Sequence, residues 1–500
     1  MDTIFGRNGD MALNVKAPPY NAKGDGVAVD RAAIQSAIND ANASYAATGQ
    51  RQSVFIPSGV YLLDSINYVK DDATTFGATS LKLLDGVELS GTGTLKVKNN
   101  AYGAGAFYRA ISSRNGGASN AGVSGITIDG NKANQVGSSQ CSNIMIEALA
   151  NITVDNVKSV NANGNGIMVR GTRTTAATNL RITRNTVTNC TCVGIQCSQF
   201  DGLVIADNYV ANTADNCIDI YGENGTILSN ARNWSITGNT VRNGLVGIFP
   251  ETSRDGIVSA NTVSGCTIGV SINRINGQPI GVVISGNVIV ACPTGVSVSG
   301  DTGGIQVRGN FIRDFTATGV QLGGGSGNIS YVTVEGNDFQ PNGATTYLIN
   351  VAGSLAAFLR ARNNSTTATN RAYDLMNTAT TNVMNILEPP HCQTQVNRDQ
   401  NLAVTGISVA SGGTFTIPIP ANTSGILTVK GTMGGGWQSA YVAAVASGSA
   451  AVAVAQSATT FTTPGNSIRN VAGSTTSLNV TVLAAASGSF GSFAWSYRYL

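Results

Sequence analysis

Charged side chains are scarce in this chain of 500 residues. Asp, Glu, Lys and Arg make up 11% of the sequence, less than half of the ~25% that is usual in globular proteins. The 30 basic and 27 acidic residues nearly cancel, and no basic cluster suited to neutralising nucleic-acid phosphates is present. The composition therefore argues against a nucleic-acid partner.

Histidine is almost absent. The single histidine, His391, stands beside two prolines, far along the chain from Cys190 and Cys192 of the CTC motif. We therefore expect no metal site and no cofactor, and a mechanism that needs a histidine is disfavoured. Without a secretory leader, the eight cysteines are interpreted as small buried thiols rather than as a disulfide framework.

Long apolar runs are also missing. No stretch of about 18 apolar residues occurs, and the first residues, MDTIFGRNGDMALNVKA, lack a basic start followed by an apolar run. We expect a soluble protein that is made without a signal peptide and does not insert into a membrane.

A repeat is the dominant feature of the sequence. Short alternating strands separated by small-residue turns recur from residue 125 onward, as in LVIADNYVANTADNCIDIYG and WSITGNTVRNGLVGIFPE. Each unit carries an asparagine in register, and neighbouring members of this series are 22 to 31 residues apart. The series consists of Asn131, Asn156, Asn185, Asn208, Asn239, Asn261, Asn287, Asn310, Asn337 and Asn363.

This spacing predicts stacked β coils, because strands with period-2 alternation cannot bury their apolar face without neighbours. Three strands per coil favour an all-β protein whose main body is a right-handed parallel β-helix. We expect the asparagines to adopt the left-handed conformation and to hydrogen-bond to one another along the stack, in a structural role. Cys190, Cys266 and Cys292 each follow a ladder asparagine by five residues, which predicts one column of buried thiols.

A short helix is predicted ahead of the repeats, with Asp30 as its N-cap and Ile34 and Ile38 on its apolar face. Such a helix would cover the open end of the first coil. The segment NAKGDGVAVDRAAIQSAI, followed by VFIPSGVYLL, resembles the opening of the pectate-lyase-like right-handed β-helix superfamily. Within it, IFGRNGDM near the start is most similar to bacteriophage tailspikes and polysaccharide depolymerases.

This resemblance implies a homotrimer in a phage tail that acts on a bacterial surface polysaccharide, a capsule or lipopolysaccharide. It also implies contact with other phage tail proteins through the N-terminus. The domains expected are an N-terminal arm over residues 1–19, a β-helix over 20–385 and a linker over 386–400. Residues 401–500 alternate as short strands with Gly and Ser turns, which favours a β-sandwich-like domain for trimerisation or carbohydrate binding.

The stretch DNCIDIYGENG, residues 215–225, crowds three carboxylates into a chain poor in charge. Aligning the coils on Ile195, Ile218, Ile248, Val270, Val296 and Val320 gives one inward column. The next residue of each coil then points outward, so Asp219 and Glu251 are expected on adjacent coils with roughly 8 Å between their backbones.

Two carboxyls on one surface suit glycoside hydrolysis, which needs an acid for the leaving oxygen and a base or nucleophile. We therefore predict Asp219 and Glu251 as the catalytic pair. Predicted to bind substrate are Tyr221, Phe249, Arg170, Glu223, Arg254 and Arg274, the aromatic rings by stacking on sugars and the arginines by pairing with acidic ones. Two alternatives stay open: a lyase with Tyr221 as base, and a receptor-binding fibre without catalysis.

Overall fold

The computed structural model describes residues 12–366 except 70–75, 104–106, 114–115, 137–140, 173, 223–230, 274–279, 301, 324–328, 343–346 and 353–354. Beyond residue 366 it describes isolated strands between residues 385 and 499. The chain divides into two compact units, residues 1–292 and 293–500. Within the described residues, no helix has the length and apolar character needed to cross a membrane.

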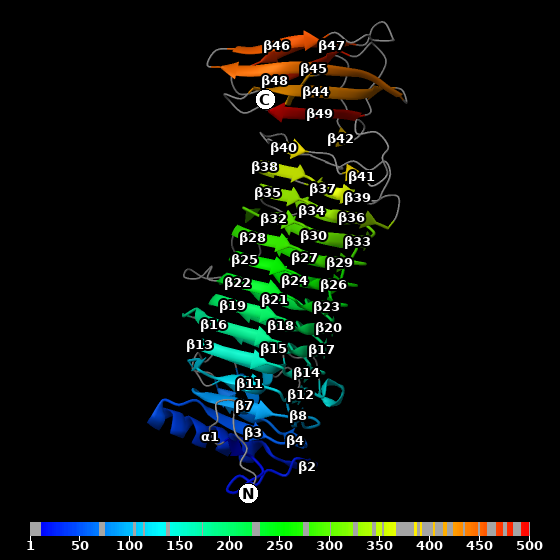
Figure 1. Cartoon of the computed structure of the whole chain (residues 1–500). Coiled ribbons are helices and arrows are strands. Elements are labelled where there is room, and N and C mark those ends of the chain that lie inside the picture. The colour runs from blue at the N-terminus through cyan, green and yellow to red at the C-terminus, as the bar shows by residue number, and fades with distance from the viewer. Residues whose placement is uncertain are drawn as a thin grey trace. The chain divides into compact units, whose positions relative to one another are not determined.

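The chain folds as a right-handed parallel β-helix, as predicted, and successive coils place one strand in each of three parallel ladders (Figure 1). In the first unit, the first sheet contains β6 (Phe76–Leu83), β9 (Phe107–Ser113), the start of β13 (Ser142–Asp155), β15 (Ile167–Arg170), β18 (Ile195–Ser198), β21 (Ile218–Tyr221), β24 (Val246–Pro250) and β27 (Ile268–Asn273). Ahead of them, β5 (Ile66–Val69) pairs antiparallel with β6.

The second sheet of this unit contains β1 (Leu13–Asn14), β3 (Gln52–Ile56), β7 (Val87–Gly91), β10 (Ala118–Ser119), β11 (Gly122–Ser124), the end of β13, β16 (Ala177–Thr183), β19 (Phe200–Ala206), β22 (Ala231–Thr237), β25 (Arg254–Ser259) and β28 (Ile280–Ser285). The third contains β2 (Asp25–Val29), β4 (Val60–Leu63), β8 (Thr94–Val97), β12 (Thr127–Asp129), β14 (Lys158–Val160), β17 (Thr186–Cys190), β20 (Tyr209–Thr213), β23 (Thr240–Arg242), β26 (Thr262–Ser264) and β29 (Val288–Val290). A short 3-10 helix, Lys132–Asn134, follows β12.

The second unit repeats the coil with β30 (Thr294–Ser299), β31 (Thr302–Gly303), β32 (Gln306–Arg308), β33 (Phe311–Phe315), β34 (Thr318–Gly323), β35 (Ile329–Glu335), β36 (Asp338–Pro341), β37 (Tyr347–Ala352), β38 (Leu355–Arg362), β39 (Ser365–Thr366), β40 (Asn385–Leu387) and β41 (His391–Cys392). The strands that follow pair antiparallel in two sheets: β42 (Val404–Thr405), β43 (Thr414–Ile417), β44 (Ser424–Met433), β45 (Gly436–Gly448), β46 (Ala451–Ser457), β47 (Ser467–Gly473), β48 (Leu478–Leu483) and β49 (Ser492–Tyr499).

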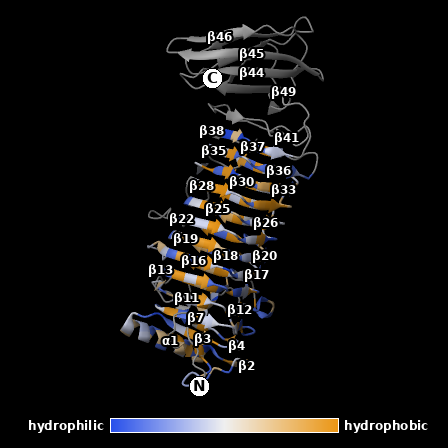
Figure 2. Ribbon diagram, in the orientation of Figure 1, coloured by the Kyte–Doolittle hydropathy of each residue, from blue (hydrophilic) through white to orange (hydrophobic). Residues whose placement is uncertain are grey.

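The core is a set of aliphatic columns along the coils, visible as hydrophobic bands on successive strands (Figure 2). Register pairs Ile182 with Ile205 and Ile205 with Ile236, and each is at most 1% exposed. Parallel in-register stacking lets each aliphatic side chain bury the one below it, which is why a single coil would be unstable by itself.

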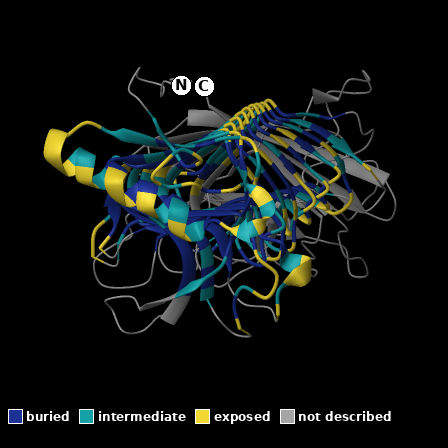
Figure 3. Ribbon diagram, turned by 90° about the horizontal axis from the view of Figure 1, so that it is seen from below, coloured by how far each residue is buried: buried dark blue, intermediate teal, exposed yellow. Residues whose placement is uncertain are grey.

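The one α-helix among the described residues, α1 (Arg31–Thr48), packs on strands of the first coils, and its faces alternate between exposed and buried (Figure 3). Ile34 and Ile38 are fully buried, as predicted. Asp30 is the N-cap residue, as predicted, but its side chain makes no capping hydrogen bond. Its carboxylate instead accepts hydrogen bonds from the backbone N–H groups of Lys23 and Gly24, at 2.6 and 2.9 Å, and so closes the preceding loop.

The asparagine ladder exists, with corrections. In the first unit it runs through Asn185, Asn208, Asn239, Asn261 and Asn287, and in the second through Asn310, Asn337 and Asn364. Each is at most 2% exposed.

Three members of the predicted series do not belong to the ladder. Asn131 bonds instead to Asn99 and to the Val97 carbonyl. Asn156 and Asn363 are each one residue early: Val157 occupies the ladder position after Asn156, and Asn364 takes the place assigned to Asn363. The left-handed residue is likewise the one before each asparagine, such as Asp207 with φ 58°, because it turns the chain so that the asparagine points inward.

The structure describes seven cysteine side chains as free thiols, and all of these but the half-buried Cys192 are buried. The predicted column of Cys190, Cys266 and Cys292 is confirmed as buried positions, and Cys217 joins it by contacting Cys266. Burial raises the pKa of the Cys190 thiol to about 12. The Cys190 thiol therefore behaves as a small apolar side chain in the core.

Candidate active site

The register predicted for the first sheet is confirmed. Gln196 pairs with Asp219, and Asp219 pairs with Phe249, while the preceding column of Ile195, Ile218 and Ile248 is fully buried. Glu251 follows β24, and its backbone N–H donates to the carbonyl of Ile220 at 2.8 Å. Asp219 and Glu251 therefore come from adjacent coils on the outward side of one sheet.

That outward side is more enclosed than alternation predicts. Asp219 is 5% exposed, Phe249 9% and Ser271 5%, whereas an uncovered sheet face would leave such side chains in water. The expected role of Phe249 as an exposed stacking platform is thus wrong in its exposure, whereas Tyr221, Gln196 and Glu251 on this face are half-buried. Loss of water around carboxyls changes their chemistry more than any single contact does.

Asp219 is held by amides on one oxygen only. Its Oδ2 accepts hydrogen bonds from Asn216 Nδ2 at 3.3 Å and from Gln196 Nε2 at 3.5 Å. Gln196 is itself oriented by Asn165, whose Nδ2 donates to Gln196 Oε1 at 2.8 Å. The other oxygen, Oδ1, is buried and has no hydrogen-bond partner among the described residues.

Burial raises the pKa of Asp219 to about 7, against the opposing effect of the Asn216 and Gln196 hydrogen bonds. Burial also raises the pKa of Glu251 to about 8, and the negative charges of Asp219 and then Asp215 add to the shift. The two carboxyls therefore hold at least one proton between them at neutral pH, which an acid and base pair requires.

Asp215, another carboxylate of the acidic stretch 215–225, affects the titration of its neighbours. It contributes to the raised pKa of both Asp219 and Glu251, and, after burial, to that of the half-buried Cys192 thiol. Three acids thus share one environment.

The arginines predicted to bind substrate do not all lie on the face of Asp219. Arg170 lies in register with Ser198 and Tyr221 on the same face, and its Nη2 pairs with Glu147 Oε1 at 2.7 Å. Arg254 belongs to β25 of the second sheet and lies 3.9 Å from Asp255, so it is not on the face of Asp219. Glu223 and Arg274 lie outside the described residues.

Asn165, Gln196 and Asn216 were not predicted as site residues. Gln196 stands in the same outward column as Asp219, so a search along that column for amides would have found it. Asn165 and Asn216 lie in the turn before their strands, where alternation gives no orientation. Among the described residues, no group of three or more His, Cys, Asp or Glu side chains is arranged to hold a metal ion.

Comparison with known proteins gives one family match. The family model described as rhamnogalacturonase A/epimerase, pectate lyase-like, matches residues 12–297. This range contains both Asp219 and Glu251.

Two curated relatives match a shorter stretch. Mannuronan C5-epimerases AlgE4 and AlgE5 of Azotobacter vinelandii are 36% and 35% identical to this chain over 138 residues, which is 25% of it. The match covers only 21% of AlgE4 and 12% of AlgE5. The chain therefore spans about a fifth or less of the length of these relatives.

Solved structures show the same fold. The A-module of mannuronan C-5 epimerase AlgE4 from Azotobacter vinelandii has a TM-score of 0.58 at 20% identity and covers 77% of this chain and 100% of its own. The pre-mature gene product 12 of bacteriophage phi29 has a TM-score of 0.53 at 16% identity and covers 74% of this chain and 55% of its own. At these identities the likeness concerns the fold alone.

Proposed function

Because the chain belongs to the rhamnogalacturonase A/epimerase, pectate lyase-like family, we propose that it is an enzyme that binds a polysaccharide and cleaves it by glycoside hydrolysis. The observation that supports hydrolysis most is the pair Asp219 and Glu251, two carboxyls from adjacent coils whose pKa values are raised to about 7 and about 8. Hydrolases of this kind need one carboxyl protonated and one ionised at the same pH.

Glu251 is the proposed acid. It has the higher pKa, so it holds its proton at neutral pH, and it is the more exposed of the two, so it can reach the leaving oxygen. Asp219 is the proposed base or nucleophile. Its Oδ2 is fixed by Asn216 and Gln196, which leaves Oδ1 unpaired to receive a proton from water or to attack the sugar.

The leaving oxygen takes the Glu251 proton as the glycosidic bond breaks, and the sugar carbon gains an oxygen from water or from Asp219. In the second case, water then releases the sugar from Asp219, with Glu251 acting as base. Tyr221, on the same face, is the residue that we propose contacts the sugar ring.

A second candidate is proton abstraction beside a uronic carboxylate, leading to epimerisation or β-elimination. The observation that favours it is the 138-residue stretch shared at 35–36% identity with mannuronan C5-epimerases. Such a reaction needs a cation to neutralise the uronate, and Arg170 on this face already pairs with Glu147 at 2.7 Å. Hydrolysis does not need such a cation, so it fits this face better than proton abstraction does.

One experiment separates these reactions. The protein is incubated with purified bacterial capsules, lipopolysaccharides, polymannuronate and polygalacturonate. Polymer size, unsaturated uronate absorbance and the proton NMR signals of C5 are then followed. Hydrolysis lowers the size without new absorbance, elimination lowers it with new absorbance, and epimerisation changes the NMR spectrum at constant size. Binding without any change supports the receptor-binding fibre and refutes the enzyme.

We further propose a bacterial surface polysaccharide as substrate and a homotrimer in a phage tail as the setting. The support is the tailspike-like motif IFGRNGDM, which lies outside the described residues. Light scattering of the intact protein should give three times the single-chain mass, and a monomer would refute the trimer.

A further inference from the structure

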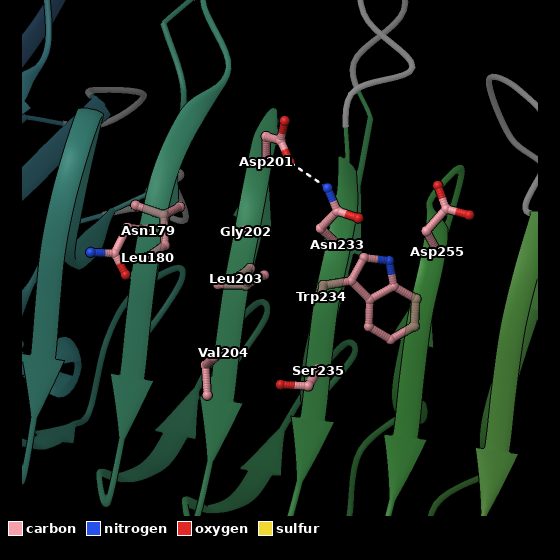
Figure 4. A pocket seen from close by; sticks show the side chains of 10 residues that line it. All are labelled: Asn179, Leu180, Asp201, Gly202, Leu203, Val204, Asn233, Trp234, Ser235 and Asp255. Atoms are coloured by element: carbon pink, nitrogen blue, oxygen red, sulfur yellow. Dashed lines mark hydrogen bonds between the residues drawn. The ribbon is translucent and has the colours of Figure 1, made fainter.

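A pocket of about 560 Å³ is lined by residues of the second sheet (Figure 4), whereas Asp219 belongs to β21 of the first sheet. Strands β16, β19, β22 and β25 each contribute to it. It is lined by Asn179, Leu180, Asp201, Gly202, Leu203, Val204, Asn233, Trp234, Ser235 and Asp255. Its volume is within the range of about 300–1,000 Å³ found for small-molecule sites.

The pocket arises from a gap in a second polar ladder. Asn179 donates from Nδ2 to Asn151 Oδ1 at 2.7 Å, and Asn151 donates in turn to Asn120. All three are in the left-handed conformation, and the next coil continues it with Gly202 at φ 93°. Because glycine has no side chain, the ladder stops there and the Asn179 Oδ1 atom accepts no hydrogen bond within the described part of the chain.

Other polar groups around the pocket are also unpaired among the described residues. The Ser235 hydroxyl makes no hydrogen bond, and the Asp255 carboxylate has only Arg254 nearby, at 3.9 Å. The buried indole N–H of Trp234, a residue 3% exposed, lacks an acceptor. A buried N–H without an acceptor destabilises the fold, so a hydroxyl-bearing ligand able to supply partners would be favoured here.

The charge of the lining decides between neutral and acidic ligands. None of the ten lining residues is Lys or Arg, and two are aspartates. Asp201 is already paired: Arg232 donates to it at 2.7 and 2.9 Å and Asn233 at 2.6 Å, and mainly the Arg232 hydrogen bond lowers its pKa. Asp255, whose side chain is 56% exposed, remains to repel anions.

We propose that this pocket is a second carbohydrate-binding site, for a neutral sugar unit, separate from the face that carries Asp219 and Glu251. Val204 provides an apolar contact, and Asn179, Ser235 and Asp255 present oxygen atoms from β16, β22 and β25. Neighbouring coils lie ~4.8 Å apart, so these oxygens lie within reach of a sugar unit and its neighbours in a chain. A polysaccharide bound in this pocket would remain on the protein between successive cleavages at Asp219 and Glu251 on the first sheet.

The test measures binding to the intact chain carrying Asp219→Asn, so that no probe is consumed. Mannohexaose and maltohexaose serve as neutral probes and hexamannuronate as the acidic one, each followed by isothermal titration calorimetry. Ser235→Tyr fills the pocket from an outward position, and Ser259→Tyr places the same bulk on the outward side of β25 away from it.

The expected result is binding of at least one neutral probe, weakened tenfold or more by Ser235→Tyr and unchanged by Ser259→Tyr. Equal loss in both variants, unchanged binding in Ser235→Tyr, binding of hexamannuronate alone, or binding of none of the probes overturns the proposal. Because Asp219 is already replaced, these results do not depend on whether the hydrolytic site works as proposed.

Discussion

The asparagine ladder and the face of Asp219 are two regions of the first unit in which polar side chains stack along the coils. They differ in how completely the buried polar atoms are hydrogen-bonded. Asn239 donates from Nδ2 to the Ile205 carbonyl and to Asn261 Oδ1, and its own Oδ1 accepts from the N–H and Nδ2 of Asn208. Among the described residues, Asp219 accepts hydrogen bonds on Oδ2 only, and its Oδ1 has no partner.

This contrast separates structure from chemistry. A buried polar column whose hydrogen bonds are all made lowers the free energy of the fold. A buried carboxyl with an unpaired oxygen raises it, and such a cost is typical of a site that is completed by a substrate. Substitutions on the face of Asp219 should therefore mainly lower catalytic turnover, whereas substitutions in the asparagine ladder should mainly lower the free energy of unfolding.

The largest effect is expected for catalysis. Asp219→Asn and Glu251→Gln keep the side-chain shape but remove the base and the acid, so each should lower turnover by several orders of magnitude. Thermal melting should show both variants folded. Full activity in both would place the active site elsewhere.

Breaking the ladder should affect stability instead. Asn239→Ala leaves the Ile205 carbonyl and the Asn208 N–H buried without partners, and we expect a loss of roughly 2–4 kcal/mol in the free energy of unfolding. Urea denaturation measures it, and polysaccharide cleavage at low temperature serves as the control. A neutral effect would contradict the structural role of the ladder.

The pH dependence of stability should reveal the free-energy cost of burying the ionised Asp219 carboxylate. Its folded pKa, about 7, lies above the ordinary aspartate pKa of 3.8, so folding favours the protonated form. The contribution is fully present below pH ~4 and is lost as the pH rises through 7. Asp219→Asn, which cannot ionise, should therefore be stabilised relative to the parent by roughly 1–3 kcal/mol more at pH 8 than at pH 5. An equal difference at both pH values would mean that Asp219 titrates normally.

The smallest effect is expected where amides stack in water. Asn243 is exposed, has φ 55° and donates to Asn212 Oδ1 at 3.0 Å. Asn243→Gly suits the left-handed backbone and should change the free energy of unfolding by no more than about 0.5 kcal/mol. A loss as large as that of Asn239→Ala would show that stacking itself, rather than burial, stabilises the ladder.

The register of the coils was predictable, while the details of their turns were not. Ile195, Ile218 and Ile248 could be aligned because strands alternate with period 2 and parallel stacking repeats one column. Asn156 and Asn363 were misplaced by one residue, because both positions of that turn accept asparagine. Asp30 was correctly predicted as the N-cap, but the bonding of its carboxylate to the Lys23–Gly24 loop was not, because the local sequence does not show which N–H groups that loop brings close.

The sequence by itself determined the parallel β-helix, the buried thiol column and the placement of Asp219 and Glu251 on adjacent coils, since all three follow from periodicity. Only the tertiary structure decided that the outward face is enclosed and that a pocket lies at Gly202 on another sheet. It also decided that Gln196 and Asn216 donate to one oxygen of Asp219, with Asn165 orienting Gln196. Periodicity gives the direction of a side chain, whereas its burial, and with it the pKa, depends on segments that approach from other coils.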